Sequence, residues 1–143
     1  MIYSVGCEYA IRTLIKLARS NSAGGFVLLR NLIDSENMPE HFVGKLMQTL
    51  VHADILVSAK GRGGGFALSR PAGQITLRQI VSAIDGDERI DRCILGFASC
   101  DELQPCPQHD EWAPIRRQIG ELLDHTTLQD LIKALEKKYH PSM

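Results

Sequence analysis

The sequence predicts a mainly α-helical protein that carries one small β-hairpin. Apolar residues recur at helical spacing in several separate segments, whereas residues 55–70 hold two β-prone runs with a glycine-rich turn between them. The chain has 143 residues, of which 44% are hydrophobic and 23% charged. These values suit one compact domain, or a small domain with an appended helix, and they exclude wholesale disorder.

The front of the chain is expected to form three helices. Residues 8–19 carry an apolar stripe with basic residues on the other side, and residues 28–35 are expected to form a short second helix. The motif Asn37-Met38-Pro39 then breaks the pattern. Because proline suits the first turn of a helix, a third helix is expected over residues 40–53.

A hairpin and a fourth helix are expected to follow. Residues 55–60 and 66–70 form the two strands, and the glycines of residues 61–65 form the turn. Thr76 is a candidate N-cap for the next helix, and Gly86 ends it.

The rear of the chain holds an irregular segment and two further helices. Residues 87–106 show no period and contain three of the four cysteines. Pro107 is expected to begin a long helix, residues 107–124. Thr126 and Gln129 fit a capping box for a final helix.

This order of elements is that of a winged helix-turn-helix, in which the second helix of the motif enters the major groove of DNA. The charge distribution agrees. Residues 1–80 hold nine basic and five acidic side chains, a net +4, whereas residues 81–143 hold seven and twelve, a net −5. A basic front half fits a polyanionic partner, although a helical core with no DNA partner remains the alternative.

Candidate DNA contacts lie on the exposed side of the third helix and at the hairpin tip. Gln and Lys side chains can read base edges or phosphates, and bare glycine backbone lets an arginine approach a narrow minor groove. Each of these side chains could equally be an ordinary solvated residue. The candidates are Pro39, Glu40, His41, Lys45 and Gln48 on the helix, and Lys60, Arg62, Gly63 and Gly64 at the tip.

A candidate metal centre lies in the cysteine segment. Cys93, Cys100, Cys106 and His109 have the spacing C-x6-C-x5-C-x2-H. Three thiolates and an imidazole could hold zinc or an iron–sulfur cluster, and free or redox-active thiols remain a third interpretation. If Pro107 is the first helical residue, Cys106 is the N-cap, and the helix dipole favours its thiolate.

Several classes of protein are not expected. No apolar run approaches the roughly 18 residues of a membrane span, and the N-terminus lacks the pattern of a signal peptide. We therefore expect a cytoplasmic protein with no membrane partner and with cysteines as thiols or metal ligands. Because no nucleophile–base set is evident, an enzyme is not expected. A cluster-carrying electron-transfer protein is the rival class.

The chain resembles the IscR/NsrR-type family of iron–sulfur winged-helix transcription regulators over about residues 3–136. The most specific stretches are the hairpin GRGGGFALSRP and the three-cysteine loop. The others are EYAIRTLIKLA, PEHFVGKLMQTLVHADILVSAK, ITLRQIVSAIDG, the W-x2-I helix and TTLQDL.

The resemblance implies a homodimeric DNA-binding transcription regulator, expected to be a repressor, on a palindromic promoter site. Residues 39–50 would read the major groove, the wing around Arg62 would reach the minor groove, and the helix of residues 107–124 would hold the dimer. The implied division is a DNA-binding domain of residues 1–86, a cluster-binding loop of residues 87–106, and dimerisation and C-terminal helices of residues 107–140.

The resemblance also implies an iron–sulfur cluster on Cys93, Cys100 and Cys106 that switches operator affinity in response to iron–sulfur status, redox stress or nitric oxide. His109 matches the fourth ligand of IscR-like members and favours a 2Fe–2S cluster. Glu8 matches the acidic residue that completes a 4Fe–4S cluster from the partner subunit in NsrR-like members, where it is Asp. The alternative is a winged-helix regulator with direct thiol sensing or a structural zinc site.

Two departures from the family pattern stand out. The first cysteine gap is six residues, where IscR-like members usually have five, which leaves the cluster type open. Asn37 stands where glycine is common in the helix-turn-helix turn. Because asparagine tolerates the left-handed conformation, the expected fold is unaffected.

Overall fold

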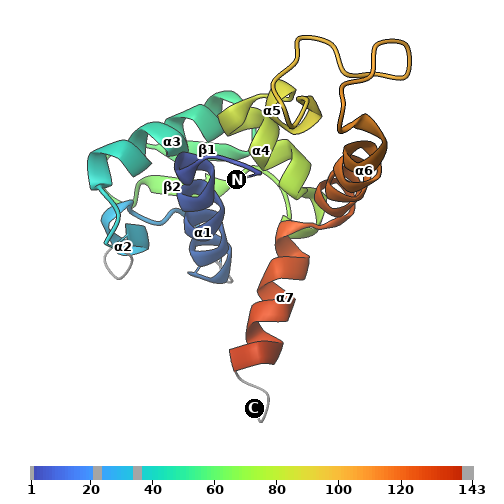
Figure 1. The fold of residues 1–143 in the computed structure, drawn as a ribbon. Coiled ribbons are helices and arrows are strands. Elements are labelled where there is room, and N and C mark those ends of the chain that lie inside the picture. Colours follow the sequence, from blue (N-terminus) through green and yellow to red (C-terminus); the bar gives the residue numbers. More distant parts are fainter. Residues whose placement is uncertain (1, 21–23, 34–36, 140–143) are drawn as a thin grey trace.

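The fold is mainly helical with an antiparallel hairpin of two strands, which confirms the predicted class. A computed structural model describes residues 2–20, 24–33 and 37–139 (Figure 1). The elements are α1 (Val5–Ser20), α2 (Arg30–Ile33), α3 (Glu40–His52), β1 (Leu56–Ala59), β2 (Gly65–Leu68), the 3-10 turn η1 (Ala72–Gln74), α4 (Leu77–Asp85), α5 (Glu88–Asp91), α6 (His109–His125) and α7 (Leu128–Tyr139).

The core lies where α1, α3 and α4 pack against one another. Leu14, Leu17, Leu50 and Ile80 are fully buried there, as the apolar stripes of their helices predict. Each such side chain contributes roughly 1.5–3 kcal/mol to stability by leaving water. The helix that carries the candidate base-reading residues, α3, is thereby held rigidly against α4.

The turn between α2 and α3 confirms the prediction for Asn37, which has φ 54° and is left-handed. The third helix begins at Glu40, directly after Pro39, as predicted. The second helix is shorter than predicted. It spans Arg30–Ile33, so residues 28 and 29 lie before its first residue. Residues 34 and 35 of the predicted helix lie outside the described residues.

The wing has a third backbone partner that was not predicted. The amide of Val27 donates to the Phe66 carbonyl at 2.9 Å, and the Phe66 amide donates to the Val27 carbonyl at 2.9 Å. This pairing holds Val27 extended, so the second helix begins only after the turn at Leu29. On the other side of β2, Leu56 pairs with Leu68 and Ser58 with Phe66.

Gly65 makes this close packing possible. Its φ is +126°, and a Cβ there would lie far inside van der Waals contact with the Val27 carbonyl oxygen. We therefore expect Gly65→Ala to lower the free energy of unfolding by about 2 kcal/mol or more, as measured by chemical denaturation. Gly63→Ala is the control, because Gly63 also has positive φ but no atom within 4 Å of the place that a Cβ would take. It should cost only about 1 kcal/mol, and equal losses in the two variants would contradict the steric argument.

The helix boundaries after the wing confirm one predicted cap. The hydroxyl of Thr76 accepts from the Gln79 amide at 3.2 Å, and the Gln79 side-chain oxygen accepts from the Thr76 amide at 3.0 Å. Gly86 ends α4 with φ 81°, again as predicted. The short helix α5 within the segment expected to be irregular was not predicted.

The predicted start of the long helix is wrong by two residues. The helix α6 begins at His109 with Gln108 as N-cap. Pro107 lies instead in a turn that the His109 amide closes onto the Cys106 carbonyl at 3.0 Å, a position that suits proline. Cys106 therefore precedes the helix and is not its N-cap.

The predicted capping box of the last helix is also displaced, by one residue. Thr127 accepts from the Asp130 amide at 3.1 Å, and Asp130 accepts from the Thr127 amide at 2.9 Å. The reason is tertiary: the Thr126 carbonyl accepts from the Leu77 amide at 2.9 Å in a bridge between the starts of α4 and α7. This bridge holds Thr127 extended, in the conformation of an N-cap.

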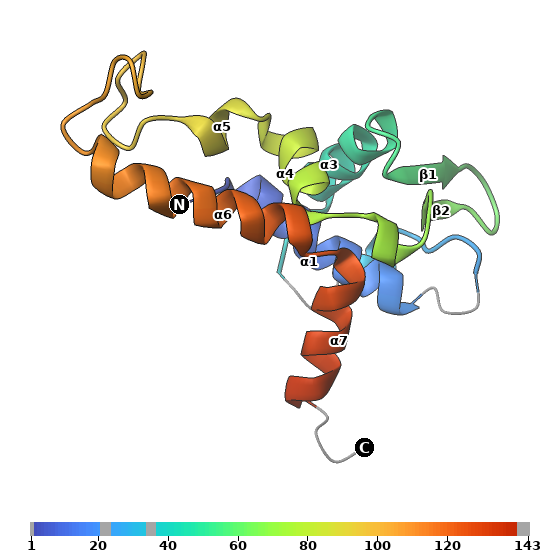
Figure 2. The same ribbon diagram turned by 90° about the vertical axis from the view of Figure 1, so that its right-hand side faces the viewer.

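The long helix α6 runs from the cysteine loop to the start of α7 (Figure 2). It lies against α4 and α5, and α7 then packs against α1 and η1. The cysteine loop extends from the start of α6, at the opposite end of the molecule from the wing. No helix in residues 2–20, 24–33 and 37–139 is both long and apolar enough to cross a membrane.

Candidate metal centre and nucleic-acid interface

The structure brings the three predicted cysteine ligands together. Cys93 follows α5, Cys100 lies in the middle of the loop, and Cys106 precedes α6. Their Sγ atoms lie within 4.8 Å of one another, and those of Cys100 and Cys106 are 3.3 Å apart. A stretch with no regular period thus closes on itself around three sulfur atoms.

His109 lies beside this group, next to Cys100. Its Nδ1 lies 3.3 Å from the Sγ of Cys100, and its position in the first turn of α6 follows from the turn at Cys106 and Pro107. All four predicted ligands therefore lie at one site, with the imidazole on α6 and the thiols on the loop. A ligand bound here would connect the loop directly to the long helix.

The electrostatics of the thiols suit a metal centre. Burial raises the pKa of Cys93, but the backbone N–H groups of Leu95 and Phe97 and the two neighbouring thiols outweigh it, so the pKa falls below its usual value. Burial and then the other two thiols raise the pKa of Cys106. Cys93 therefore loses its proton more readily than an isolated thiol and Cys106 less readily, and a bound cation would replace the protons of its thiol ligands.

The donor set fits zinc and iron–sulfur clusters alike. Both take soft thiolates, and both accept an imidazole as one ligand of four. Harder cations such as Mg²⁺ and Ca²⁺ prefer oxygen ligands, which these four side chains do not supply. The chemistry of the site therefore defines a soft metal centre.

The two residues near the start of α1 do not join this centre within one chain. Glu8 lies in the first helical turn, half-buried, and is not part of the group that the cysteines form among the described residues. Cys7 is fully buried. Burial, and then the charges of Asp85 and Glu8, raise its pKa to about 12, which makes it an inert thiol.

The candidate base-reading residues form one exposed surface on α3. Glu40, His41, Lys45 and Gln48 are exposed and line a groove of about 630 Å³ together with Leu29 and Gly44. Pro39 is exposed at the start of the helix. The surface has the polar side chains and the helical presentation that a major groove requires.

The wing tip presents most of its predicted contacts. Lys60, Arg62 and Gly63 are exposed, whereas Gly64 is buried beneath the tip. Gly64 donates its amide to the Gly61 carbonyl at 3.0 Å, and a Cβ on it would overlap the Ala59 carbonyl. Gly64 therefore shapes the turn that carries Arg62 and presents no exposed surface of its own.

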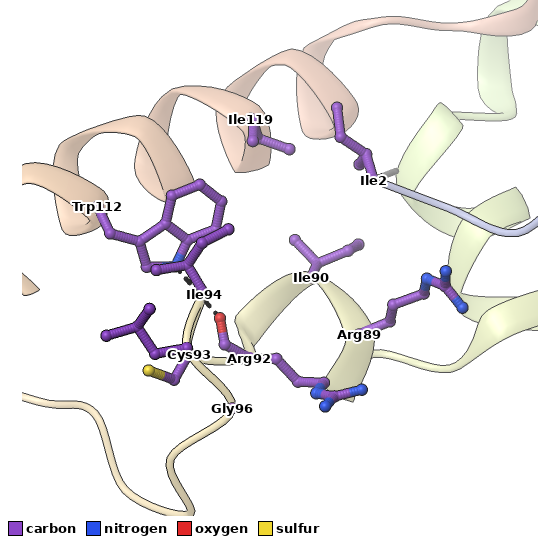
Figure 3. Close-up of a pocket in the computed structure, with 10 residues that line it drawn as sticks. Ile2, Arg89, Ile90, Arg92, Cys93, Ile94, Gly96, Trp112 and Ile119 are labelled. Atoms are coloured by element: carbon purple, nitrogen blue, oxygen red, sulfur yellow. Dashed lines mark hydrogen bonds between the residues drawn. The ribbon is translucent and has the colours of Figure 1, made fainter. Parts of the chain in front are cut away.

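An apolar pocket beside the metal centre was not predicted (Figure 3). It has a volume of about 610 Å³ and lies between the N-terminal segment, α5 and α6. Trp112 and Ile119 form its α6 wall, and the indole Nε1 donates to the Arg92 carbonyl at 3.2 Å. The sequence signal was the apolar spacing along the long helix, which could not show what the stripe faces.

A winged helix-turn-helix with a group of potential metal ligands beside a long helix is an arrangement typical of a DNA-binding transcription regulator. Residues 3–134 match the Rrf2 family, which is described as iron-dependent transcriptional regulators. The chain belongs to this family, as the resemblance implied.

Individual relatives agree with this assignment. The transcriptional regulator IscR of Cronobacter sakazakii is 27% identical over 129 residues, which cover 90% of this chain and 78% of the relative. The structure of CymR, the global cysteine regulator of B. subtilis, is similar with a TM-score of 0.76 at 26% identity, covering 92% of this chain and 95% of that one. The structure of T. potens IscR has a TM-score of 0.75 at 23% identity, covering 95% and 89%, and supports the fold.

The family assignment settles the class of function. Its members here are transcriptional regulators and not enzymes, in agreement with the expectation from the sequence. The family therefore supports DNA as a partner of this chain. The three-cysteine group gives the loop a set of ligands suited to a metal.

Proposed function

We propose that this Rrf2 regulator is a homodimer, acting as a repressor, whose operator affinity is switched by an iron–sulfur cluster. The observation that carries the proposal is the gathering of Cys93, Cys100 and Cys106 within 4.8 Å, with His109 beside them on α6. The similarity to IscR of Cronobacter sakazakii supports the same interpretation. The cluster would supply a centre that iron shortage, oxidation or nitric oxide can remove.

His109 is the proposed fourth ligand, and a 2Fe–2S cluster is favoured. The 3.3 Å separation of His109 Nδ1 from Cys100 Sγ supports this choice. A 4Fe–4S cluster completed by Glu8 of the partner subunit is the second possibility, and Glu8 is accessible enough, being half-buried, to serve that role.

The proposed dimer interface is the apolar stripe of α6. Ile115 and Leu122 are 49% and 57% exposed, whereas Leu123, on the adjacent face, is buried in the core. Trp112, Ile115, Ile119 and Leu122 repeat at three- and four-residue spacing, the pattern of a helix that packs against another helix. Such a dimer would place two copies of α3 on half-sites about one or two helical turns apart in a palindrome.

The chain's own contacts give a route from the centre to the DNA. Trp112 donates to the Arg92 carbonyl at 3.2 Å, and Arg116 donates to the Asp91 carbonyl at 3.1 Å. These bonds tie the segment before Cys93 to α6. An ordered loop therefore fixes the start of α6, and α6 in turn lies against α4 of the DNA-binding half.

Metal analysis of anaerobically purified protein tests the proposal. We expect coloured protein that contains iron and acid-labile sulfide, with an absorption band that disappears on oxidation. Colourless protein with one zinc per chain would contradict it and favour the structural-zinc alternative, which the tetrahedral type of donor set also fits. Metal-free protein that loses thiols on oxidation would favour direct thiol sensing, for which the 3.3 Å between Cys100 and Cys106 is the supporting observation.

Arg62→Ala tests the wing. Arg62 is exposed at a tip of bare backbone, so its loss should weaken binding to most DNA sequences alike. The slope of log affinity against log salt should become shallower by about one unit, as measured by fluorescence anisotropy over a salt series. Arg19→Ala, which removes an exposed charge from the end of α1, is the matched control. Unchanged affinity and slope in Arg62→Ala would remove the wing from the interface.

A further inference from the structure

One ion pair joins the DNA-binding half to the last turn of the long helix. Arg78, in the first turn of α4, donates from Nε to Asp124 Oδ1 at 2.7 Å, and its Nη2 lies 3.4 Å from Asp124 Oδ2. The same Nη2 donates to the Gly120 carbonyl at 3.4 Å. The guanidinium thus donates hydrogen bonds to both a side chain and the backbone of α6. A lysine could not make this set of bonds with the same geometry.

Gly120 provides the space that this contact needs. It lies in the interior of α6 without positive φ, where glycine costs about 0.5–1 kcal/mol relative to alanine. A Cβ at this position would lie 3.0 Å from Arg78 Nη2. The glycine therefore serves no turn; its missing side chain lets the guanidinium lie directly on the helix.

The contact lies beside the backbone junction of the two halves. The Leu77 amide donates to the Thr126 carbonyl at 2.9 Å, and the Leu128 amide donates to the Ile75 carbonyl at 2.8 Å. These bonds tie the start of α4 to the junction of α6 and α7. The Arg78–Asp124 pair lies two residues before Thr126, and the Arg78–Gly120 bond six residues before it, so Arg78 adds side-chain contacts to α6 beside this backbone junction.

The metal centre is at the other end of the same helix. His109 and Asp124 are 15 residues apart on α6, which corresponds to roughly 22 Å. A small change of angle at Asp124 therefore becomes a displacement of several ångströms at the cysteine loop and at the proposed dimer stripe. The Arg78–Asp124 pair thus lies near the end of α6 that is attached to α4, and the candidate metal ligands lie at the other end.

The pair is charged and partly open to solvent. The hydrogen bond from Arg78 lowers the pKa of Asp124 below its usual range, and the same bond raises the pKa of Arg78. The side chains are 26% and 51% exposed. Substitution of either residue should therefore leave the fold intact, because surface pairs of this kind contribute little to stability.

We infer that Arg78, Gly120 and Asp124 form a clamp that sets the angle of α6 on the DNA-binding half, and through it the half-site spacing that the dimer prefers. Arg78 is in this sense a positioning residue for DNA recognition, with no contact to the DNA. The inference rests on the proposed function, because only a dimer held through α6 converts this angle into a spacing. It makes the clamp the element through which the cysteine loop biases operator choice.

The test compares Asp124→Asn and Gly120→Ala with wild-type protein. The probes are duplexes selected by the wild type from a random pool, rebuilt with the spacer between half-sites lengthened or shortened by one and two base pairs. We expect both variants to stay folded and dimeric, to lose the preference for one spacing, and to show an affinity ratio between holo- and metal-free protein reduced about five- to tenfold. Arg117→Gln, which removes a charge from the same helix, is the control and should behave as wild type.

The outcomes separate the possible failures. If the wild type shows neither a preferred spacing nor a metal-dependent affinity, the proposed function fails and this inference fails with it. If the wild type shows both and the two variants match it, only the clamp is overturned. If Asp124→Asn binds all duplexes more tightly and Arg78→Ala binds all of them more weakly at unchanged spacing preference, Arg78 contacts phosphate and the clamp is again overturned.

Discussion

Cys100→Ala should lose the metal centre completely while the protein remains a folded dimer. Cys100 Sγ lies 3.3 Å from Cys106 Sγ and 3.3 Å from His109 Nδ1. Its removal therefore takes away the ligand that is in contact with both. The loop is largely exposed and adds little to the core, which is why the fold should survive. We expect iron and sulfide to fall to background and any metal-dependent difference in DNA affinity to vanish.

The matched control is Cys7→Ala, which also removes one cysteine. Cys7 is buried in the core and is not part of the three-cysteine group, so this variant should keep its metal and lose only about 1 kcal/mol of stability through the small cavity. Metal content, thermal unfolding and sedimentation would be measured on both. A Cys100→Ala protein that retains full iron, or one that keeps a metal-dependent affinity, would remove the centre from the proposed switch.

The same assay distinguishes the two proposed fourth ligands. His109→Ala should destabilise or change the spectrum of the centre if the imidazole is a ligand, and Glu8→Gln should then have no effect. The reverse result would assign the ligand to Glu8 of the partner subunit. The proximity of His109 to Cys100 in a single chain favours the first outcome.

Ile115→Gln combined with Leu122→Gln should convert the dimer to a monomer. Each side chain is about half exposed in one chain, and burying such a residue against a partner contributes roughly 1.5–3 kcal/mol. Because a symmetric dimer loses four such contacts at once, the dissociation constant of the dimer should rise by about a thousandfold or more. Sedimentation over a concentration series measures this directly.

DNA binding should fall with the dimer. Two linked half-site contacts exceed one by about 10²–10⁴ in affinity, so the double variant should bind a palindrome only as weakly as a single half-site. Arg117→Gln, on the other side of α6 and exposed, is the control and should leave both assembly and affinity unchanged. A double variant that remains dimeric would place the interface elsewhere on the molecule.

The Cys100→Ala variant and the double variant at Ile115 and Leu122 test two separate features of α6. At its start α6 carries His109, and along its exposed side it carries the apolar stripe. Loss of the metal should leave the dimer intact, and loss of the dimer should leave the metal bound. If each change instead abolished both properties, the centre would itself be part of the interface, which is the arrangement that a ligand from Glu8 of the partner subunit requires.

The order and type of the principal elements could be predicted from the sequence, because these depend on local properties. Apolar spacing located the principal helices of the core, Thr76 and Gln79 gave the cap of α4, and Asn37 gave the left-handed turn before α3. The candidate ligands followed from residue type and spacing: the three cysteines lie within 4.8 Å of one another and His109 lies 3.3 Å from Cys100, while their role as metal ligands stays a prediction. Local chemistry is sufficient wherever neighbouring residues supply the partners.

Features whose partners come from distant segments could not be predicted in this way. Val27 is extended because Phe66 pairs with it, and Thr127 rather than Thr126 caps α7 because Leu77 binds the Thr126 carbonyl. Gly120 is explained by Arg78, 42 residues earlier in the chain. In each case a backbone or guanidinium group satisfies its hydrogen bonds across the fold, and no periodicity within one segment can reveal such a bond.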